Sequence, residues 1–200
     1  MTRENKKYNL DLSDLARSGH VTRWHSVRTL REQTLAEHHY MVAMIANKLA
    51  KDILGASISD SDRLQLLEYA LWHDMPEIIM GDISSPCKRR IQQLCDGKEN
   101  PIDQLENEIA PWLKKFKSSL KPELTQIAKL SDLMDAIVFI AQEGIGRHAE
   151  TVKNELLKSF EGKIQEAEQT MTMYSWSIAS DVLEKLLSED KRIEFEIETE

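Results

Sequence analysis

Two short stretches of this sequence combine the side chains that bind divalent metal ions. Histidine and an acidic residue stand next to each other at Glu37-His38 and again at His73-Asp74. Imidazole nitrogens and carboxylate oxygens together suit a divalent first-row metal ion. Neighbouring positions of a helix point about 100° apart, so His73 and Asp74 can face one ion only where a helix ends or is distorted. Pro76 provides such a place, because proline lacks an amide donor and restricts the residue before it.

An apolar stretch further along the chain offers a carboxylate that would complete such a site. Asp132 and Asp135 lie among Leu, Met, Ile and Val residues between positions 128 and 138. Burying an acid beside these side chains costs free energy unless the acid is paired or bound to a cation. Two other interpretations stay open: the aspartates lie on a solvent-facing edge of a helix, or Lys129 neutralises Asp132. Spacing alone also leaves open which aspartate is the ligand.

The segments that carry these residues are typical of helices. Apolar residues recur at three- and four-residue steps from about 35 to 54, where Gly55 can end the helix. Residues 59–62 offer N-cap side chains for a second helix, which we expect to stop near Asp74–Met75 before a new turn at Pro76. Further helices are expected at about 101–117, 122–144, 148–168 and 174–188. The prediction is an all-α fold, a bundle of five or six helices.

Composition and charge exclude several classes of protein. The chain has 200 residues, 41% of them hydrophobic and 30% charged, which fits one globular domain rather than a disordered protein. No apolar run is long enough for a membrane span, and the first residues lack the apolar stretch of a signal peptide. Cys87 and Cys95 are too few for a disulfide framework, so we expect structural thiols in a cytoplasmic protein. A net charge of −8 argues against a protein that binds nucleic acid.

The charge is unevenly distributed along the chain. Residues 1–31 carry seven basic and three acidic side chains, whereas residues 189–200 carry two basic and six acidic ones. We interpret the acidic C-terminal tail as a solvated terminus, although the alternation from Ile193 to Glu198 could instead pair as an edge strand. The basic N-terminal segment is the part of the chain that we expect to meet an anion.

The ordered series His38, His73-Asp74 and Asp132 resembles the H…HD…D signature of the HD-domain metal-dependent phosphohydrolases. The sequence also resembles the small YfbR-type 5′-deoxynucleotidases and the phage dATP triphosphohydrolases, which share this skeleton. The resemblance rests on six segments: Arg23-Trp24, Val27-Arg28-Thr29, Glu37-His38, His73-Asp74-x-x-Glu77, Gly81-Asp82 and Pro86-x-Lys88. It implies a single HD domain over residues 1–200, with a metal-site core at about 15–145, additional C-terminal helices at 146–188 and the acidic tail at 189–200.

The resemblance implies a role for each matching residue of the metal site. The metal ligands would be His38, His73, Asp74 and Asp132. Glu77 would be the catalytic glutamate, because one turn past the His-Asp pair it could orient or deprotonate a water for in-line attack on phosphorus. An acid at that place could also simply complement a helix dipole. The divalent ion would be Co, Mn, Zn, Fe, Ni or, less naturally, Mg.

The substrate contacts implied by the resemblance are Arg23, Trp24, Asp82, Lys88 and Arg28. The guanidinium of Arg23 can bind two phosphate oxygens at once. The indole of Trp24 would press against the deoxyribose and exclude a 2′-hydroxyl. Asp82 would accept a hydrogen bond from the sugar 3′-hydroxyl, and Lys88 and Arg28 are further candidates for phosphate contact.

Two features separate this sequence from the family pattern. His39 directly follows His38 where the relatives often have a small polar residue, so a second imidazole could compete for the metal or tune it. Asp135 stands one turn from Asp132, and only the register counted from Lys129 favours Asp132 as the ligand.

The main hypothesis is a 5′-deoxynucleotidase, which releases phosphate from deoxynucleoside monophosphates. The alternative is a triphosphohydrolase of the phage kind, which attacks the same ester and releases the whole polyphosphate; the cluster Lys88-Arg89-Arg90 and the basic N-terminal segment favour it. A third hypothesis is a non-catalytic nucleotide-binding module. The resemblance implies a homodimer or higher homo-oligomer in the cytoplasm of a bacterium or of a phage-infected host cell, with no membrane or nucleic-acid polymer as partner. Apolar residues of the late helices could make subunit contacts or fill the core: Phe160, Met171, Met173, Tyr174, Trp176 and Ile178.

Overall fold

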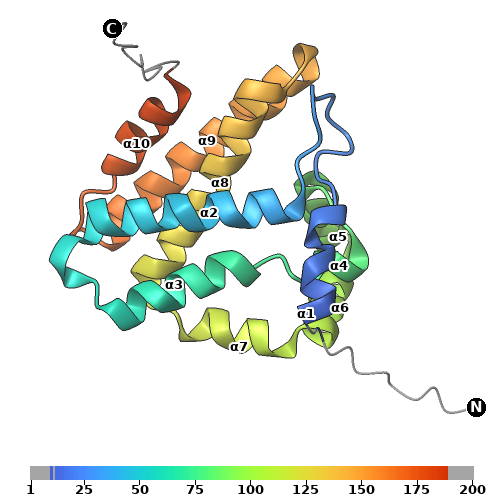
Figure 1. Ribbon diagram of the computed structural model, residues 1–200, viewed down its shortest axis with the longest axis horizontal. Coiled ribbons are helices and arrows are strands. Elements are labelled where there is room, and N and C mark those ends of the chain that lie inside the picture. Colours follow the sequence, from blue (N-terminus) through green and yellow to red (C-terminus); the bar gives the residue numbers. More distant parts are fainter. Residues whose placement is uncertain (1–9, 11, 189–200) are drawn as a thin grey trace, which may run out of the picture.

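The computed structural model describes residue 10 and residues 12–188, and these residues form an all-helical fold (Figure 1). The bundle is built from α2 (Leu35–Leu49), α3 (Asp60–Trp72), α8 (Pro122–Glu143), α9 (Gly146–Thr170) and α10 (Ile178–Leu187). The shorter helices are α1 (Leu12–Leu15), α4 (Glu77–Met80), α5 (Ser85–Leu94), α6 (Pro101–Ile109) and α7 (Pro111–Ser119). Within the described part, β-structure is limited to isolated bridges. The all-α prediction is confirmed.

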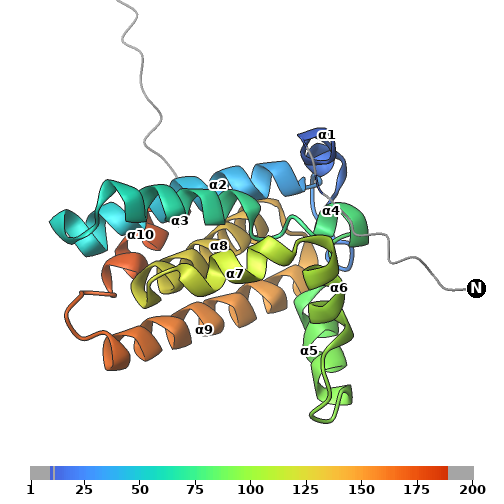
Figure 2. The same cartoon turned by 90° about the horizontal axis from the view of Figure 1, so that it is seen from below.

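Helix α8 lies at the centre of the bundle. It contacts α2, α3, α9 and α10, and its inward side chains Ile127, Leu130, Met134 and Ile137 are fully buried. Helices α5 and α6 extend away from the bundle at the end where α4 lies (Figure 2). The bundle therefore leaves the beginning of α2, the end of α3 and the middle of α8 close to these short helices.

Side-chain caps set where α2 and α3 begin. The hydroxyl of Thr34 accepts a hydrogen bond from the Glu37 amide, and the Glu37 carboxylate accepts one from the Thr34 amide. Ser59 and Asp62 form the same reciprocal pair at the start of α3, as expected from the N-cap residues at 59–62. Helix α2 continues through a π-helical turn, 50–54, and ends at Gly55, where φ is +55°.

Prolines account for one wrong helix prediction. The single helix expected at 101–117 is divided into α6 and α7, because Pro111 cannot continue a helix but suits the first position of a new one. Helix α3 ends at Trp72, slightly before the expected stop near Asp74–Met75. Helix α5 was not expected, and none of its residues is buried. It therefore adds no buried stripe to the core, although Cys87, Ile91 and Leu94 recur at helical spacing in its sequence.

The late helices use most of their apolar residues in the core. Phe160 and Trp176 are buried, and Met171, Tyr174 and Ile178 pack against the same core. Met173 is 80% exposed. Core packing is therefore the use of these residues within the chain, apart from Met173.

The segment between α1 and α2 carries Arg23 and Trp24 and is fixed at both ends. Backbone hydrogen bonds join Arg23 N to Gln33 O at 2.9 Å and Leu35 N to Val21 O at 2.8 Å. Two more join the segment to the end of α8, from Leu30 N to Glu143 O at 2.8 Å and from Ile145 N to Arg28 O at 2.9 Å. This segment is therefore held between the start of α2 and the end of α8.

Three other expectations concern the chain as a whole. Among the described helices, none combines the length and apolar character that crossing a bilayer requires. Cys87 and Cys95 are both free thiols; Cys87 is exposed and Cys95 is partly buried, so a structural role has no support at Cys87. The acidic tail 189–200, for which we expected a solvated terminus or an edge strand, lies outside the described residues.

Candidate active site and metal centre

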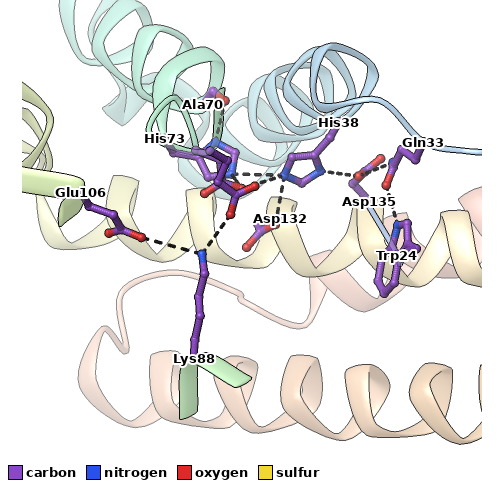
Figure 3. Close-up of polar contacts among 11 residues, drawn as sticks. Trp24, Gln33, His38, Ala70, His73, Lys88, Glu106, Asp132 and Asp135 are labelled. Atoms are coloured by element: carbon purple, nitrogen blue, oxygen red, sulfur yellow. Dashed lines mark hydrogen bonds and ion pairs between the residues drawn. The ribbon is translucent and has the colours of Figure 1, made fainter. Parts of the chain in front are cut away.

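The imidazole of His38, which is fully buried on α2, is the centre of the site (Figure 3). Its Nε2 lies 3.3 Å from Nε2 of His73, 3.4 Å from a carboxylate oxygen of Asp132 and 3.5 Å from one of Asp74. The four residues named by the HD signature thus converge on one point from α2, from the end of α3 and from α8.

The end of α3 explains how two adjacent residues face the same point. Helical hydrogen bonding stops at Trp72, so His73 and Asp74 lie in the turn that leads to α4. Nδ1–H of His73 donates to the carbonyl of Ala70 at 2.8 Å, which leaves Nε2 free to face the site. That Nε2 lies 3.3 Å from Asp74. The distortion expected before Pro76 is therefore present.

The two aspartates of α8 lie on opposite sides of the His38 ring. Asp132 faces Nε2, together with His73 and Asp74, whereas Asp135 accepts a hydrogen bond from Nδ1–H at 2.6 Å. Asp135 is buried, while the side chain of Asp132 is 45% exposed. Asp132 is therefore the aspartate that could complete a ligand set, and Asp135 is a partner of the histidine.

Distances and charges at this point both fit a cation. Ligand atoms about 2.1 Å from a tetrahedral ion lie about 3.4 Å from one another, and the contacts among these residues measure 3.3–3.5 Å. One ligand atom each from His38, His73 and Asp74 lies within 4.8 Å of the other two. Burial lowers the pKa of His73, but Asp74 and Asp132 outweigh it and raise that pKa to about 9. The surroundings of the His73 ring thus strongly favour positive charge.

Glu77 is the first residue of α4 and is buried beside the cluster. One carboxylate oxygen accepts a hydrogen bond from Lys88 at 3.0 Å, and the other is buried without a hydrogen-bond partner. Burial and the nearby Asp74 raise the pKa of Glu77 to about 8, although Lys88 acts against them. A carboxylate with one free oxygen and a raised pKa is suited to accepting a proton near neutral pH.

Arg23 approaches the same cluster from the segment between α1 and α2. Its Nη1 is buried without a hydrogen-bond partner. Burial lowers the pKa of Arg23, but Asp74, Asp132 and other carboxylates outweigh this effect and raise that pKa. A guanidinium with a free N–H beside a candidate cation site can bind an anion that the two cations share. Asp82 lies close enough to contribute to the raised pKa values of Arg23 and Glu77.

Trp24 has an uncommon backbone conformation, with φ of +68°. A bulky residue in this region costs roughly 1–3 kcal/mol and persists only where its surroundings hold it. The indole is held by a hydrogen bond from Nε1–H to Oε1 of Gln33 at 2.7 Å and by stacking on Phe139 at a ring distance of 6.1 Å. Such strain is typical of a functional site.

Three of the residues singled out in the sequence lie apart from this cluster of contacts. Arg28, Arg89 and Arg90 are exposed, and none of them lines the cavity described below.

His39 is buried, with its ring 5.8 Å from that of His38 and 5.3 Å from that of His73. Its Nε2 has no hydrogen-bond partner, and burial and His73 lower its pKa to about 3. His39 therefore lies behind the converging atoms as a neutral ring.

A cavity of about 250 Å³ opens from the cluster. Its lining includes His73, Asp74, Asp132, Glu77 and Lys88, and also Lys129, which the sequence analysis weighed as a partner of Asp132. Four further lining residues were not connected with the site: Tyr69, Glu106, Lys117 and Thr125. Helical spacing offered a signal for some of them. Thr125 and Lys129 precede Asp132 by seven and three residues on α8, and Tyr69 precedes His73 by four, so each pair shares a helix face.

Comparison with known proteins assigns the family. A family model described as 5′-deoxynucleotidase YfbR-like matches residues 12–181, which is most of the chain. The chain belongs to the YfbR-like family of HD phosphohydrolases. As a YfbR-like protein it is an HD-domain deoxynucleotide phosphohydrolase, which confirms the predicted enzyme class and removes the hypothesis of a non-catalytic module.

Individual YfbR-like relatives cover different shares of this chain. A dATP triphosphohydrolase of Acinetobacter phage SH-Ab 15497 is 30% identical over 188 residues, which are 89% of this chain and 91% of the phage protein. A 5′-deoxynucleotidase of Pasteurella multocida is 29% identical over 132 residues, 59% of this chain and 66% of that protein. The triphosphohydrolase thus matches a larger share of both chains.

A solved structure shares the fold. The HD phosphohydrolase DatZ of cyanophage S-2L, bound to dA and one catalytic Zn²⁺ ion, superposes with a TM-score of 0.77 over 90% of this chain and 98% of its own. The two sequences are 23% identical, so this likeness shows the fold. The predicted HD-domain fold is confirmed.

Proposed function

We propose that this YfbR-like enzyme cleaves deoxynucleoside 5′-triphosphates into a deoxynucleoside and tripolyphosphate, with dATP as the first substrate to test. The observation that supports the proposal is the group of lysines in the cavity lining. Lys88, Lys117 and Lys129 line the cavity together with candidate metal ligands, and they would offset the charge of phosphates beyond the one attacked. A monophosphate needs no such group of lysines. The extensive match to a dATP triphosphohydrolase supports the same substrate class.

We propose His38, His73, Asp74 and Asp132 as the ligands of one divalent cation. A divalent cation in this position would supply Lewis acidity, which lowers the pKa of a water and withdraws charge from a phosphate oxygen. Two imidazoles and two carboxylates suit Zn²⁺, Co²⁺, Mn²⁺, Fe²⁺ or Ni²⁺ better than Mg²⁺. We favour Zn²⁺ because the DatZ structure contains it.

Glu77 would act as the general base in this reaction. Its unpartnered oxygen accepts the proton of the attacking water, while Lys88 holds the other oxygen. The water oxygen forms a bond to the α-phosphorus, and the bond between that phosphorus and the 5′-oxygen breaks. The leaving 5′-oxygen takes up a proton from solvent, and Glu77 releases the proton it accepted to solvent. The products are the deoxynucleoside and tripolyphosphate.

Arg23 and the cavity lysines would bind the phosphates. The free Nη1 of Arg23 donates to the α-phosphate, and Lys88 stabilises the negative charge that develops on it. Lys117 and Lys129 contact the β- and γ-phosphates. Arg28 stays a prediction as a further phosphate contact, since its side chain is exposed.

Trp24 and Asp82 would select the sugar. The strained backbone of Trp24 and its stacking on Phe139 hold the indole rigidly, which suits a wall that excludes a 2′-hydroxyl. Asp82 accepts a hydrogen bond from the 3′-hydroxyl. Replacing dATP by ATP should therefore lower kcat/KM.

A product assay tests the proposed reaction. Metal-loaded enzyme is incubated with dATP or dAMP, and tripolyphosphate and orthophosphate are identified by ³¹P NMR. We expect tripolyphosphate from dATP and slow release of orthophosphate from dAMP. Orthophosphate from dAMP as the main activity would overturn the proposal in favour of the 5′-deoxynucleotidase, the hypothesis that the family description favours.

Lysine variants connect this assay with the cavity. Lys117→Met and Lys129→Met should each raise KM for dATP about tenfold, which is about 1.4 kcal/mol, and leave dAMP turnover almost unchanged. Lys48→Met is the matched control, because Lys48 pairs with Asp52 on the surface of α2, ten residues or about 15 Å along the helix from His38. Equal effects on dATP and dAMP would contradict the assigned role.

A further inference from the structure

Three consecutive hydrogen bonds connect Trp24 with His38 (Figure 3). Nε1–H of Trp24 donates to Oε1 of Gln33 at 2.7 Å, and the Nε2 amide of Gln33 donates to Asp135 at 2.9 Å. The same oxygen of Asp135 accepts from Nδ1–H of His38 at 2.6 Å. A residue proposed to contact the sugar is thus joined to a residue proposed to bind the cation, through Gln33 and Asp135.

The side-chain amide of Gln33 can make both of these hydrogen bonds in one orientation only. An indole N–H is a donor, so it must face the amide oxygen, and a carboxylate is an acceptor, so it must face the amide nitrogen. Gln33 is 2% exposed, and its backbone carbonyl accepts a hydrogen bond from the backbone amide of Arg23 at 2.9 Å. A rotated or displaced Gln33 would leave buried polar groups unpaired at both ends, which is costly.

Asp135 transmits this orientation to the imidazole. Its Oδ2 accepts hydrogen bonds from both Gln33 and His38, so the carboxylate and the ring are fixed relative to each other. When Nδ1 carries the proton that Asp135 accepts, the lone pair of Nε2 points at the face shared by His73, Asp74 and Asp132. Partners of this kind orient metal-ligating histidines and raise their affinity for the metal.

We propose that Gln33 and Asp135 are positioning residues that couple binding of the deoxynucleoside moiety at Trp24 to binding of the divalent cation at His38. The inference rests on the proposed function, which assigns Trp24 to the sugar and His38 to the cation. A deoxynucleoside that packs against the indole would strengthen its hydrogen bond to Gln33 and, through Asp135, the orientation of the ring that faces the cation. Coupling between two binding sites is reciprocal, so the cation tightens the deoxynucleoside site by the same factor.

The test measures cation affinity and its change on deoxynucleoside binding. Co²⁺ is titrated into metal-free protein and followed by its visible absorption, with and without saturating deoxyadenosine, so that no catalysis is needed. Deoxyadenosine should lower the Kd for Co²⁺ about fivefold or more in the unchanged protein. Asp135→Asn should raise that Kd about 10–100-fold.

Two variants separate coupling from simple support of the ligand. Gln33→Met removes both hydrogen bonds of the amide, so it should weaken Co²⁺ binding several-fold and abolish the effect of deoxyadenosine. Trp24→Phe keeps a ring for stacking on Phe139 but loses the N–H, so it should still bind Co²⁺ and lose the coupling. Because Trp24→Phe leaves the buried amide in place, it tests the coupling even where Gln33→Met does not fold.

Gln126→Met is the matched control. Gln126 is also a buried amide, 5% exposed, and donates to the carbonyl of Lys163 at 2.7 Å, away from the site. Gln126→Met should lower the free energy of unfolding about as much as Gln33→Met, without changing the Co²⁺ affinity or the coupling. Equal effects of Gln126→Met and Gln33→Met, or coupling that persists in both Gln33→Met and Trp24→Phe, would overturn the inference.

The outcome is distinguishable from failure of the proposed function. An enzyme that yields tripolyphosphate from dATP but shows no coupling contradicts only the positioning role. An enzyme that releases only orthophosphate from dAMP but shows the coupling contradicts only the triphosphate proposal. A protein that binds no Co²⁺ contradicts both.

Discussion

At the scale of single residues, Glu77 has two carboxylate oxygens in different environments. One is held by Lys88, and the other is buried without a partner next to the candidate metal ligands. Burial and the charge of Asp74 raise the pKa of Glu77 to about 8, whereas Lys88 lowers it. A general base works when deprotonated, so kcat must fall as the pH drops below the pKa that Glu77 has in the loaded enzyme.

Removing Lys88 should therefore shift the acidic limb of the pH profile of kcat, which is the range where kcat falls as the pH drops. Lys88→Met deletes the positive charge that lowers the pKa of Glu77, so the pKa rises and the limb of the kcat profile shifts to higher pH. The measurement is kcat for dATP at saturating substrate across the acidic and neutral range. Glu77→Gln, which cannot accept the proton, should lower kcat roughly 10²–10⁴-fold while Co²⁺ affinity is kept. An unshifted limb together with an active Glu77→Gln variant would exclude Glu77 as the base.

Motif spacing predicted which residues converge, but not which of them face the candidate cation site and which orient a histidine. His38, His73, Asp74 and Asp132 meet at one point, and Glu77 lies beside it. The difference between Asp132 and Asp135 depends on which imidazole nitrogen of His38 each carboxylate faces, and this is set by how α2 crosses α8. Gln33 carried no signal in the sequence, because its role depends on partners 9 and 102 residues away.

At the scale of helices, the start of α2 is also a support of the site. The reciprocal cap of Thr34 and Glu37 closes the first turn four residues before His38, and Gln33 immediately precedes the cap. Helix α3 begins with the same kind of cap at Ser59, but the candidate ligands His73 and Asp74 follow its opposite end. The two caps thus differ in their distance from the candidate metal centre while sharing the same chemistry.

Cap removal should separate stability from metal binding. Thr34→Ala and Ser59→Ala should each lower the free energy of unfolding by about 1 kcal/mol, because each leaves an amide of the first turn unpaired. Only Thr34→Ala should also weaken Co²⁺ binding, since fraying of that turn releases His38. Urea unfolding and Co²⁺ titration measure the two effects. Equal Co²⁺ affinities in the two variants would show that the cap of α2 does not support the site.

Helix prediction succeeded where an apolar stripe is buried and failed elsewhere. The periodicity of 35–54 and 122–144 is that of α2 with its π-helical turn and of α8, which share the core. Helix α5 buries no residue, so the apolar positions Cys87, Ile91 and Leu94 of its sequence add nothing to the core. The break at Pro111 had a local signal, because proline in the middle of a proposed helix should have divided it.

At the scale of the whole molecule, the net charge of −8 is a poor guide to the ligand. The six acidic residues of segment 189–200 account for much of it, and four more carboxylates surround the candidate cation site: Asp74, Glu77, Asp82 and Asp132. The cavity beside this site is lined by lysines as well as by carboxylates. An acidic protein can therefore bind a polyphosphate through a cation and a local basic surface.

The candidate ligands come from α2, from the turn after α3 and from α8, so a cation should stabilise the whole bundle. At a free concentration 100 times its Kd, it adds about 2.7 kcal/mol, which corresponds to a Tm about 5–10 °C higher in a protein of this size. Adding EDTA to Zn²⁺-loaded protein should remove this gain in a thermal scan. His38→Ala, which lacks the central ligand, should show no response to EDTA.

The loss of Tm on chelation should also depend on pH. Without the cation, protonated His73 balances the carboxylates, and its pKa is raised from 6.5 to about 9 in the folded protein. A raised folded-state pKa contributes stability that is complete below 6.5 and is lost as the pH rises through about 9. The cation-loaded protein does not depend on that proton, because a ligating imidazole is neutral. The difference in Tm between loaded and chelated protein should therefore widen from pH 6.5 towards pH 9, and a difference that narrows would place the stabilising cation away from His73.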